Sequence, residues 1–262
     1  MPNHNTVRLG KAAPVHDPRT LLFSKYALAQ EAEAALHTPH GTNWLAMETS
    51  WNMYGNNVLG DCVEAAAAHM VCVWNSWNQP AHLPPTTAQV IEAYSAVGGY
   101  VPGNPSTDNG TSMLAFLKYW RSVGIAGNKI LGFCALTPGN IHELRQAIFL
   151  FGAAFVGLQM PLTAQDETQW AIVENGGPDA QPGSWGGHCV PAARYKKRRG
   201  GGPHGNSHVV RWGAIYGMND EFYRRCNDES YAVLSAEWLN GTTGRAPNNF
   251  DLAQFEADLA AI

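Results

Sequence analysis

The sequence has few charged residues and no long apolar run. Charged residues make up 15% and apolar residues 45% of the 262 residues, a balance typical of a packed globular protein. The net charge of −4 argues against a general attraction to nucleic acid or acidic membranes. No stretch is long enough to span a membrane, and Met1–Asn5 lacks the apolar region of a secretion signal. We therefore expect a cytoplasmic protein with no membrane or specific nucleic-acid partner.

Paired cysteines and nucleotide-binding motifs are also missing. An odd number of cysteines without a C-x-x-C pair argues against a disulfide framework and favours reduced thiols. The sequence has no P-loop, no G-x-G-x-x-G motif that joins a strand to a helix, and no G-x-S-x-G elbow that would mark a serine nucleophile. Zinc is conceivable at His204 and His208 with His188 and Cys189 nearby, but the usual cysteine pairs are absent. We expect no metal and no cofactor. The five cysteines are Cys62, Cys72, Cys134, Cys189 and Cys226.

Hydrophobic periodicity predicts an α+β protein. Helices are expected at 26–37, 62–77, 86–97, 112–123, 138–151, 221–226 and 251–262, and strands at 129–136, 155–160, 188–195, 207–214 and 230–235. The helix at 62–77 is apolar nearly all round, so it should be buried at the centre. The pattern suggests an N-terminal arm (1–42) and one domain (43–262). That domain would comprise a helical part to about 150, a β-rich part at 151–235 and the closing helix.

Cys62 stands where a polar, glycine-containing loop meets the central helix. A helix N-terminus favours a thiolate, which is the nucleophilic form of cysteine. The alternative is a small buried side chain, because cysteine is often inert in cores. His69 lies two turns along the same helix, about 10 Å away at 1.5 Å per residue. It is therefore too distant to serve as the base for Cys62 and is predicted to be a satisfied core histidine.

A second informative stretch runs from Pro182 to Val190 and contains His188. The glycines before this histidine allow close approach of the backbone, and the strand that follows would fix the imidazole ring. The basic run 196–199 is interpreted as the solvated tip of a hairpin, and Asp228–Glu229 as ordinary surface charge.

Taken together, these stretches resemble the papain-like cysteine peptidases over residues 43–235. Cys62 matches the nucleophile, with Gly60 two residues before it and Asn56 at the place of the oxyanion-hole glutamine. Trp44 falls at the family's Asp-Trp near the start of the domain, and Asp108–Gly110 resembles its glycine-rich turn.

The second half of the resemblance lies in the β-rich part. His188-Cys189-Val190 resembles the family's His-Ala-Val strand, about 130 residues after the cysteine. Trp212-Gly213 resembles its Ser-Trp-Gly. The resemblance implies a two-lobe fold, with a helical lobe around a central helix and an antiparallel β lobe. It also implies a divergent bacterial or phage member of the family, acting on a peptide or protein. If a phage encodes the protein, the resemblance allows a location in the virion.

The resemblance further implies a thiol hydrolase that acts through a thioester intermediate. Cys62 would be the nucleophile and His188 the base, held as imidazolium, while Asn56 and the Cys62 N–H would bind the oxyanion. Trp185, Gly187 and Trp212 are candidate substrate-binding residues; the two tryptophans would also shield the Cys62–His188 pair from water.

The departures from the family leave a second hypothesis open. The orienting asparagine of the family is replaced by Val210, the oxyanion glutamine is shortened to Asn56, and Val63 replaces a tryptophan. Asn206 and Asn219 are candidate replacements for the orienting side chain. The rival hypothesis is a papain-like scaffold without activity that binds a partner or takes part in assembly.

Overall fold

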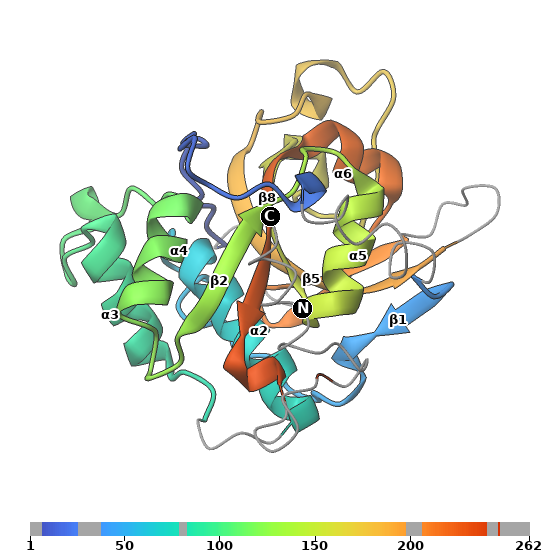
Figure 1. Cartoon of the computed structure of the whole chain (residues 1–262). Helices are drawn as coiled ribbons and strands as arrows, with labels where there is room; N and C mark the ends of the chain where they lie inside the picture. The colour runs from blue at the N-terminus through green and yellow to red at the C-terminus, as the bar shows by residue number, and fades with distance from the viewer. Residues whose placement is uncertain (1–6, 26–37, 79–82, 198–205, 240–245, 247–262) are drawn as a thin grey trace.

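The computed structural model describes residues 7–25, 38–78, 83–197, 206–239 and 246. It confirms a mixed α+β fold with a helical region beside a mostly antiparallel sheet (Figure 1). In this view, helices α3 (Thr87–Gly98) and α4 (Met113–Ser122) lie on one side of strand β8 (Asn227–Ser235), and α5 (Ile141–Phe151) and α6 (Asp220–Cys226) lie on the other. None of the helices among the described residues is long and apolar enough to cross a membrane.

Among the described residues, the sheet has eight strands in the order β2-β8-β3-β5-β6-β7-β4, and β1 pairs with β5 outside this path. All pairs are antiparallel except β4 with β7. Long β5 therefore lies at the centre of the sheet. The strands are β1 (Gly41–Asn43), β2 (Ile130–Ala135), β3 (Ala154–Met160), β4 (Gln169–Trp170), β5 (Gly186–Lys196), β6 (Ser207–Arg211), β7 (Ala214–Met218) and β8 (Asn227–Ser235).

Helices α3 to α6 begin with side-chain caps that the sequence supplies. Thr86 and Gln89 form a capping box at the start of α3, and Ser112 caps α4. The α-helices are α2 (Cys62–Asn78), α3 (Thr87–Gly98), α4 (Met113–Ser122), α5 (Ile141–Phe151) and α6 (Asp220–Cys226). Within the described residues, short 3₁₀ helices occur at Trp44–Ala46, Pro105–Thr107, Leu162–Ala164, Gly177–Ala180 and Ala236–Trp238.

Helix α2 forms the core between the helical region and the sheet. Every residue from Cys62 to Trp74 is buried, as its apolar circumference predicts. Alanines at positions 65–68 allow close packing, and Trp74 stacks on Trp120 of α4 with ring centroids 5.7 Å apart. The N-terminus of α2, where Cys62 lies, is consequently fixed by packing on several sides.

Most predicted elements are confirmed within one to three residues. Strand 207–214 is the main error, because the chain turns at Trp212-Gly213 and returns as β7. The predicted loop 163–183 contains the short strand β4 and a 3₁₀ turn. The predicted helices 26–37 and 251–262 lie outside the described residues. The division into arm and lobes stays a prediction.

Candidate active site

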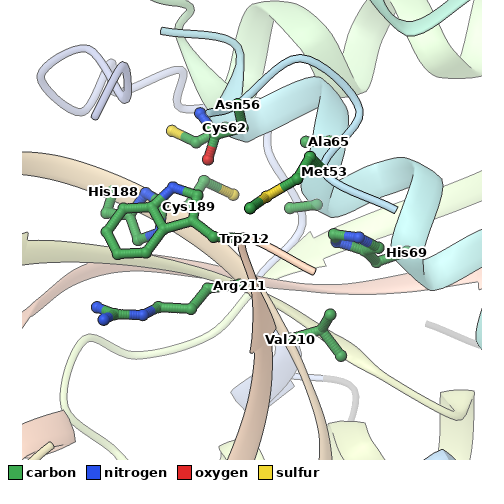
Figure 2. Close-up of a pocket in the computed structure, with 11 residues that line it drawn as sticks. Met53, Asn56, Cys62, Ala65, His69, His188, Cys189, Val210, Arg211 and Trp212 are labelled. Carbon is green, nitrogen blue, oxygen red and sulfur yellow. The ribbon is translucent and has the colours of Figure 1, made fainter. Parts of the chain in front are cut away.

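One pocket brings together residues that are far apart in the sequence. It lies between the start of α2, strand β5 and the turn that joins β6 to β7. Figure 2 shows Cys62 and Asn56 at one side of this pocket, with His188 and Trp212 opposite them. The lining residues are Met53, Asn56, Cys62, Ala65, Ala66, His69, His188, Cys189, Val210, Arg211 and Trp212.

Cys62 is the first residue of α2 and is 1% exposed. The loop before it is fixed by Asp108, whose carboxylate accepts hydrogen bonds from the Gly60 N–H at 2.9 Å and the Tyr94 hydroxyl at 2.6 Å. Burial raises the pKa of the Cys62 thiol to about 12, although hydrogen bonds from the backbone of Cys189 and Gly10 favour the thiolate. At neutral pH, Cys62 in this state is therefore a protonated thiol.

His188 lies on β5 and is 1% exposed. Neither of its ring nitrogens has a hydrogen-bond partner among the described residues. Burial, together with the positive charge of Arg211, holds the pKa of His188 well below its usual value. In this state burial shifts the pKa values of both groups toward their neutral forms, so the expected imidazolium–thiolate pair stays a prediction.

Aromatic rings, in place of hydrogen bonds, hold His188 in position. Its ring stacks on Trp212 with centroids 5.0 Å apart, and it meets the Trp170 ring edge to face with centroids 6.4 Å apart. The Arg211 guanidinium lies over Trp212 and Tyr216, 4.0 Å from each ring centroid. Asn206 and Asn219 were candidate orienters, and that expectation is wrong. The His188 nitrogens are unpartnered, and the Asn219 side chain caps α6 by accepting from Phe222.

Asn56 lies at the rim of the pocket with its amide donors already used. Its Nδ2 donates to the carbonyl of Leu59 at 3.0 Å and to the carbonyl of Arg8 at 3.3 Å. The Arg8 N–H in turn donates to the Asn56 carbonyl at 3.3 Å. Asn56 is therefore bound by the N-terminal part of the chain.

The segment Arg8–Ala12, called the arm segment below, lies directly beside Cys62. On one side its Gly10 carbonyl accepts from Thr111 at 2.8 Å, and its Ala12 N–H donates to the Thr111 carbonyl at 3.0 Å. On the other side the Lys11 N–H donates to the Gly187 carbonyl at 3.0 Å. The arm segment thus fills a slot between the loop before α4 and the start of β5.

The slot is so narrow that only glycine fits where the backbone of the arm segment meets its walls. A Cβ added to Gly10 would lie 1.7 Å from the Gly60 oxygen, and one added to Gly187 would lie 2.2 Å from the Lys11 oxygen. A Cβ on Gly110 would lie 2.1 Å from the Gly10 oxygen. Since real Cβ atoms do not approach so closely, these positions require glycine as long as the arm segment is present.

The structure brings most of the predicted site residues together. Cys62, His188, Asn56 and Trp212 line the pocket. Trp185 packs on Trp212 with centroids 5.7 Å apart, and Gly187 binds the arm segment. The roles assigned to these residues stay predictions.

One neighbour of the pocket was predicted correctly, and two residues near it were misread or missed. His69 is, as expected, a satisfied core histidine whose ring nitrogen bonds the Asn52 carbonyl at 2.7 Å. The interpretation of Asp228–Glu229 as surface charge is wrong for Glu229, which is 7% exposed and pairs with Lys11. Arg211 was not singled out, although an arginine beside a tryptophan in a strand was the available signal.

No cluster of three potential metal ligands occurs within the part of the chain that the structure describes. His204, one member of the conceivable zinc set, lies outside that part. His208 is on β6, where burial lowers its pKa to about 4.

Comparison with known proteins identifies the fold. No family model matches the sequence, and no curated protein matches it significantly. Xylellain, a cysteine protease from Xylella fastidiosa, superposes with a TM-score of 0.64 at 10% identity over 88% of this chain and 97% of its own. ProCathepsin B S9 from Trypanosoma congolense gives 0.56 at 9% identity, covering 87% and 86%. A recombinant stem bromelain precursor gives 0.53 at 15% identity, covering 88% and 80%. The chain therefore has the papain-like fold at low sequence identity.

Proposed function

We propose that this protein is a thiol hydrolase that cleaves peptide or related amide bonds through a thioester intermediate. The observation that supports this most is the pocket shared by Cys62, His188 and Asn56 in a papain-like fold. A nucleophile at a helix start, a base on a facing strand and an amide donor at the rim are the three groups that acyl transfer from an amide needs. The substrate would be a peptide or a protein.

In this mechanism His188 takes the thiol proton as the Cys62 sulfur attacks the substrate carbonyl carbon. The C=O electron pair moves onto the oxygen, which the Cys62 N–H and the Asn56 amide stabilise. When the C–N bond breaks, the amine leaves with the proton from His188, and the acyl group stays on sulfur. Water then hydrolyses the thioester, with His188 as base, and restores the thiol.

The buried state described above is the resting form in this proposal. The arm segment removes water from Cys62 and binds the Asn56 amide, so neither group is ready for chemistry. Admission of water and substrate would relieve the burial that keeps both groups neutral. Trp212 would keep the His188 ring oriented, in place of the carboxamide that Val210 does not supply.

Active-site-directed labelling tests this function. We expect an epoxide or vinyl sulfone peptide probe to label Cys62, identified by mass spectrometry of the digested protein. Cys62→Ser should abolish the label, and His188→Ala should slow it by at least about 100-fold, the lower end of general-base effects. Cys72→Ser is the matched control, because Cys72 is a buried thiol of the same helix outside the pocket.

The second candidate function is a binding or assembly scaffold without catalysis. The raised pKa of Cys62 and the unpartnered nitrogens of His188 favour it. If a panel of such probes leaves Cys62 unlabelled even after release of the arm segment, the scaffold becomes the better account.

A further inference from the structure

The Lys11 side chain is buried in a pocket lined by acidic groups of β8. Its Nζ lies 2.8 Å from the Asp228 carboxylate and 3.2 Å from the Glu229 carboxylate, and its side chain is fully buried. The third ammonium proton goes to the Ala12 carbonyl at 3.1 Å. All three donors of the ammonium group are thus used. Burial alone would lower the pKa of Lys11, but Glu229 and Asp228 together raise it above its usual value.

The carboxylates are fixed independently of Lys11. The Tyr231 hydroxyl donates to Glu229 at 2.9 Å, and the Gln159 amide donates to Asp228. Gly157 makes room for Glu229, because a Cβ at this glycine would lie 2.9 Å from the Glu229 Cγ. The four side chains of Gln159, Asp228, Glu229 and Tyr231, with the space beside Gly157, are called the acidic pocket below.

The acidic pocket adjoins the proposed nucleophile. In the sheet, Gly157 of β3 stands opposite Cys189 of β5 on one side and opposite Glu229 of β8 on the other. The backbone of Cys189 hydrogen-bonds the Cys62 thiol. A side chain seated in the acidic pocket therefore belongs to a backbone that passes Cys62, as the arm segment does.

The arm segment is bound in the way an extended peptide would be. The backbone hydrogen bonds come from Thr111 and Gly187, and they do not depend on the identity of the bound side chains. The acidic pocket, in contrast, binds the Lys11 side chain through its positive charge. Departure of the arm segment would leave two largely buried carboxylates without a cation, which is unfavourable unless another positive group enters.

We infer that the acidic pocket is the specificity site of this cleft and that it selects a lysine or arginine side chain of the peptide substrate. This inference rests on the proposed function. The arm segment is the built-in occupant of the same site, with Lys11 in the position of the selected substrate side chain. A substrate must therefore displace the arm segment, and one with a basic residue regains the ion pairs that displacement breaks.

A peptide-binding experiment separates this inference from the hydrolase proposal. The receptor is the full chain with Gly10→Ala, which places a Cβ against the Gly60 oxygen and removes the arm segment from the slot, combined with Cys62→Ser to prevent turnover. The first ligand is an N-acetylated Arg-Leu-Gly-Lys-Ala peptide, and the second has norleucine in place of lysine. In both, the C-terminal amide carries a fluorophore. Fluorescence anisotropy gives the two dissociation constants.

We expect the lysine peptide to bind about 10–100-fold more tightly than the norleucine peptide, the range for charge-assisted hydrogen bonds. Adding Glu229→Gln should reduce this ratio to near one. Glu221→Gln, at an exposed glutamate of α6, should leave it unchanged. Lys11→Met provides a second released receptor with an intact acidic pocket if Gly10→Ala lowers the yield of folded protein.

Equal binding of the two peptides to both released receptors, or no binding of either peptide, would overturn the inference. Lys11 would then serve only to anchor the arm segment to the protein. Hydrolysis assays with the Cys62 form distinguish the two proposals. Preferential binding of the lysine peptide without hydrolysis would reject the proposed hydrolase function but support the acidic pocket as a specificity site. Hydrolysis without preference for basic residues would reject the acidic pocket as a specificity site while the hydrolase stands.

Discussion

The protonation states of Cys62 and His188 are set by burial in this structure. A helix N-terminus stabilises a thiolate by roughly 0.3–1 kcal/mol at exposed sites. Each unit of raised pKa corresponds to about 1.4 kcal/mol against the thiolate. Because the Cys62 pKa rises from 9.0 to about 12, burial outweighs the helix. Access of water therefore decides whether this thiol reacts.

The pH dependence of alkylation tests this directly. We expect iodoacetamide to modify Cys62 slowly from pH 6 to 9, with the rate still rising above pH 10, because only the thiolate reacts. Gly10→Ala should lower the apparent pKa of Cys62 and raise the rate at pH 7 by at least about tenfold. Mass spectrometry of the digest assigns the adduct. An apparent pKa near 8.5 in the unmodified chain would contradict the buried state.

Glu64 gives a residue-scale prediction about stability. It is fully buried on α2, and burial raises its pKa from 4.5 to about 8. The folded state then holds a proton that the unfolded state loses above about pH 4.5. The free energy of unfolding should therefore fall between pH 4.5 and pH 8 and level off above it.

Glu64→Gln should remove this dependence and raise the free energy of unfolding at pH 8 by up to a few kcal/mol. Urea unfolding at pH 5 and pH 8 measures the change. Glu92→Gln, at an exposed position of α3, should leave the pH dependence as it is. The same pH dependence in both variants would show that Glu64 is ionised in the folded state.

The proposed reactive residues are predictable from sequence, and their environment is not. Cys62 before an apolar helix and His188 after glycines are local patterns that indicate chemistry. The buried Glu229 pairs with Lys11, which is 218 positions earlier in the chain. A local sequence pattern cannot reveal an ion pair between residues so far apart in the chain. In the sequence, Asp228–Glu229 therefore looks like ordinary surface charge.

At the scale of elements, the turn between β6 and β7 controls the His188 ring. Arg211 pairs with Ala214, so the turn consists of Trp212 and Gly213. Their φ angles of 43° and 69° lie in the left-handed region, which is unusual for a tryptophan. Such a conformation persists only when packing stabilises it. The stacking of Trp212 on His188 and Arg211 provides that packing.

Substitution of Trp212 separates the two effects. Asparagine adopts the left-handed conformation readily, so Trp212→Asn relieves the backbone strain but removes the aromatic ring. Trp212→Phe keeps an aromatic ring and also keeps the backbone strain. We expect Trp212→Asn to lower kcat on a peptide substrate about tenfold, since an aromatic pair contributes about 0.5–1.5 kcal/mol. Trp212→Phe should retain most of kcat. Equal kcat in both variants would show that His188 does not need this stacking.

Predictability differs among the elements for physical reasons. Helices α2, α3 and α4 combine an apolar pattern with polar or capping residues at their starts, so their positions follow from the sequence. The end of β6 does not, because a tryptophan in a left-handed turn contradicts its local preference. The short strand β4 is two residues long, which is too few for a periodic pattern.

At the scale of the whole molecule, the arm segment joins the helical region to the sheet across the proposed active site. The sequence predicts an arm over residues 1–42, and its proline and polar content predicts that it lies on the surface of the body. Its passage through the slot depends on Gly10, Gly60, Gly110 and Gly187, which are scattered along the chain and meet only in the folded state.

Release of the arm segment should therefore increase activity. We expect Gly10→Ala to raise kcat/KM on a basic peptide substrate at least about tenfold, with a modest loss of thermal stability. Gly132→Ala is the matched control, because a Cβ at Gly132 meets nothing within 4 Å. Unchanged kcat/KM with a released arm would show that the arm segment does not limit access to Cys62.

The most direct measurement of the central claim is the mass of the intact protein during reaction with an activated peptidyl ester. In the chain with Gly10→Ala, we predict an acyl adduct on Cys62 that forms and then decays as product appears. The adduct should be absent in Cys62→Ser and should form and decay at least about 100-fold more slowly in His188→Ala. Absence of an adduct in both the unmodified and the arm-released protein, or one that forms and decays independently of His188, would contradict the account.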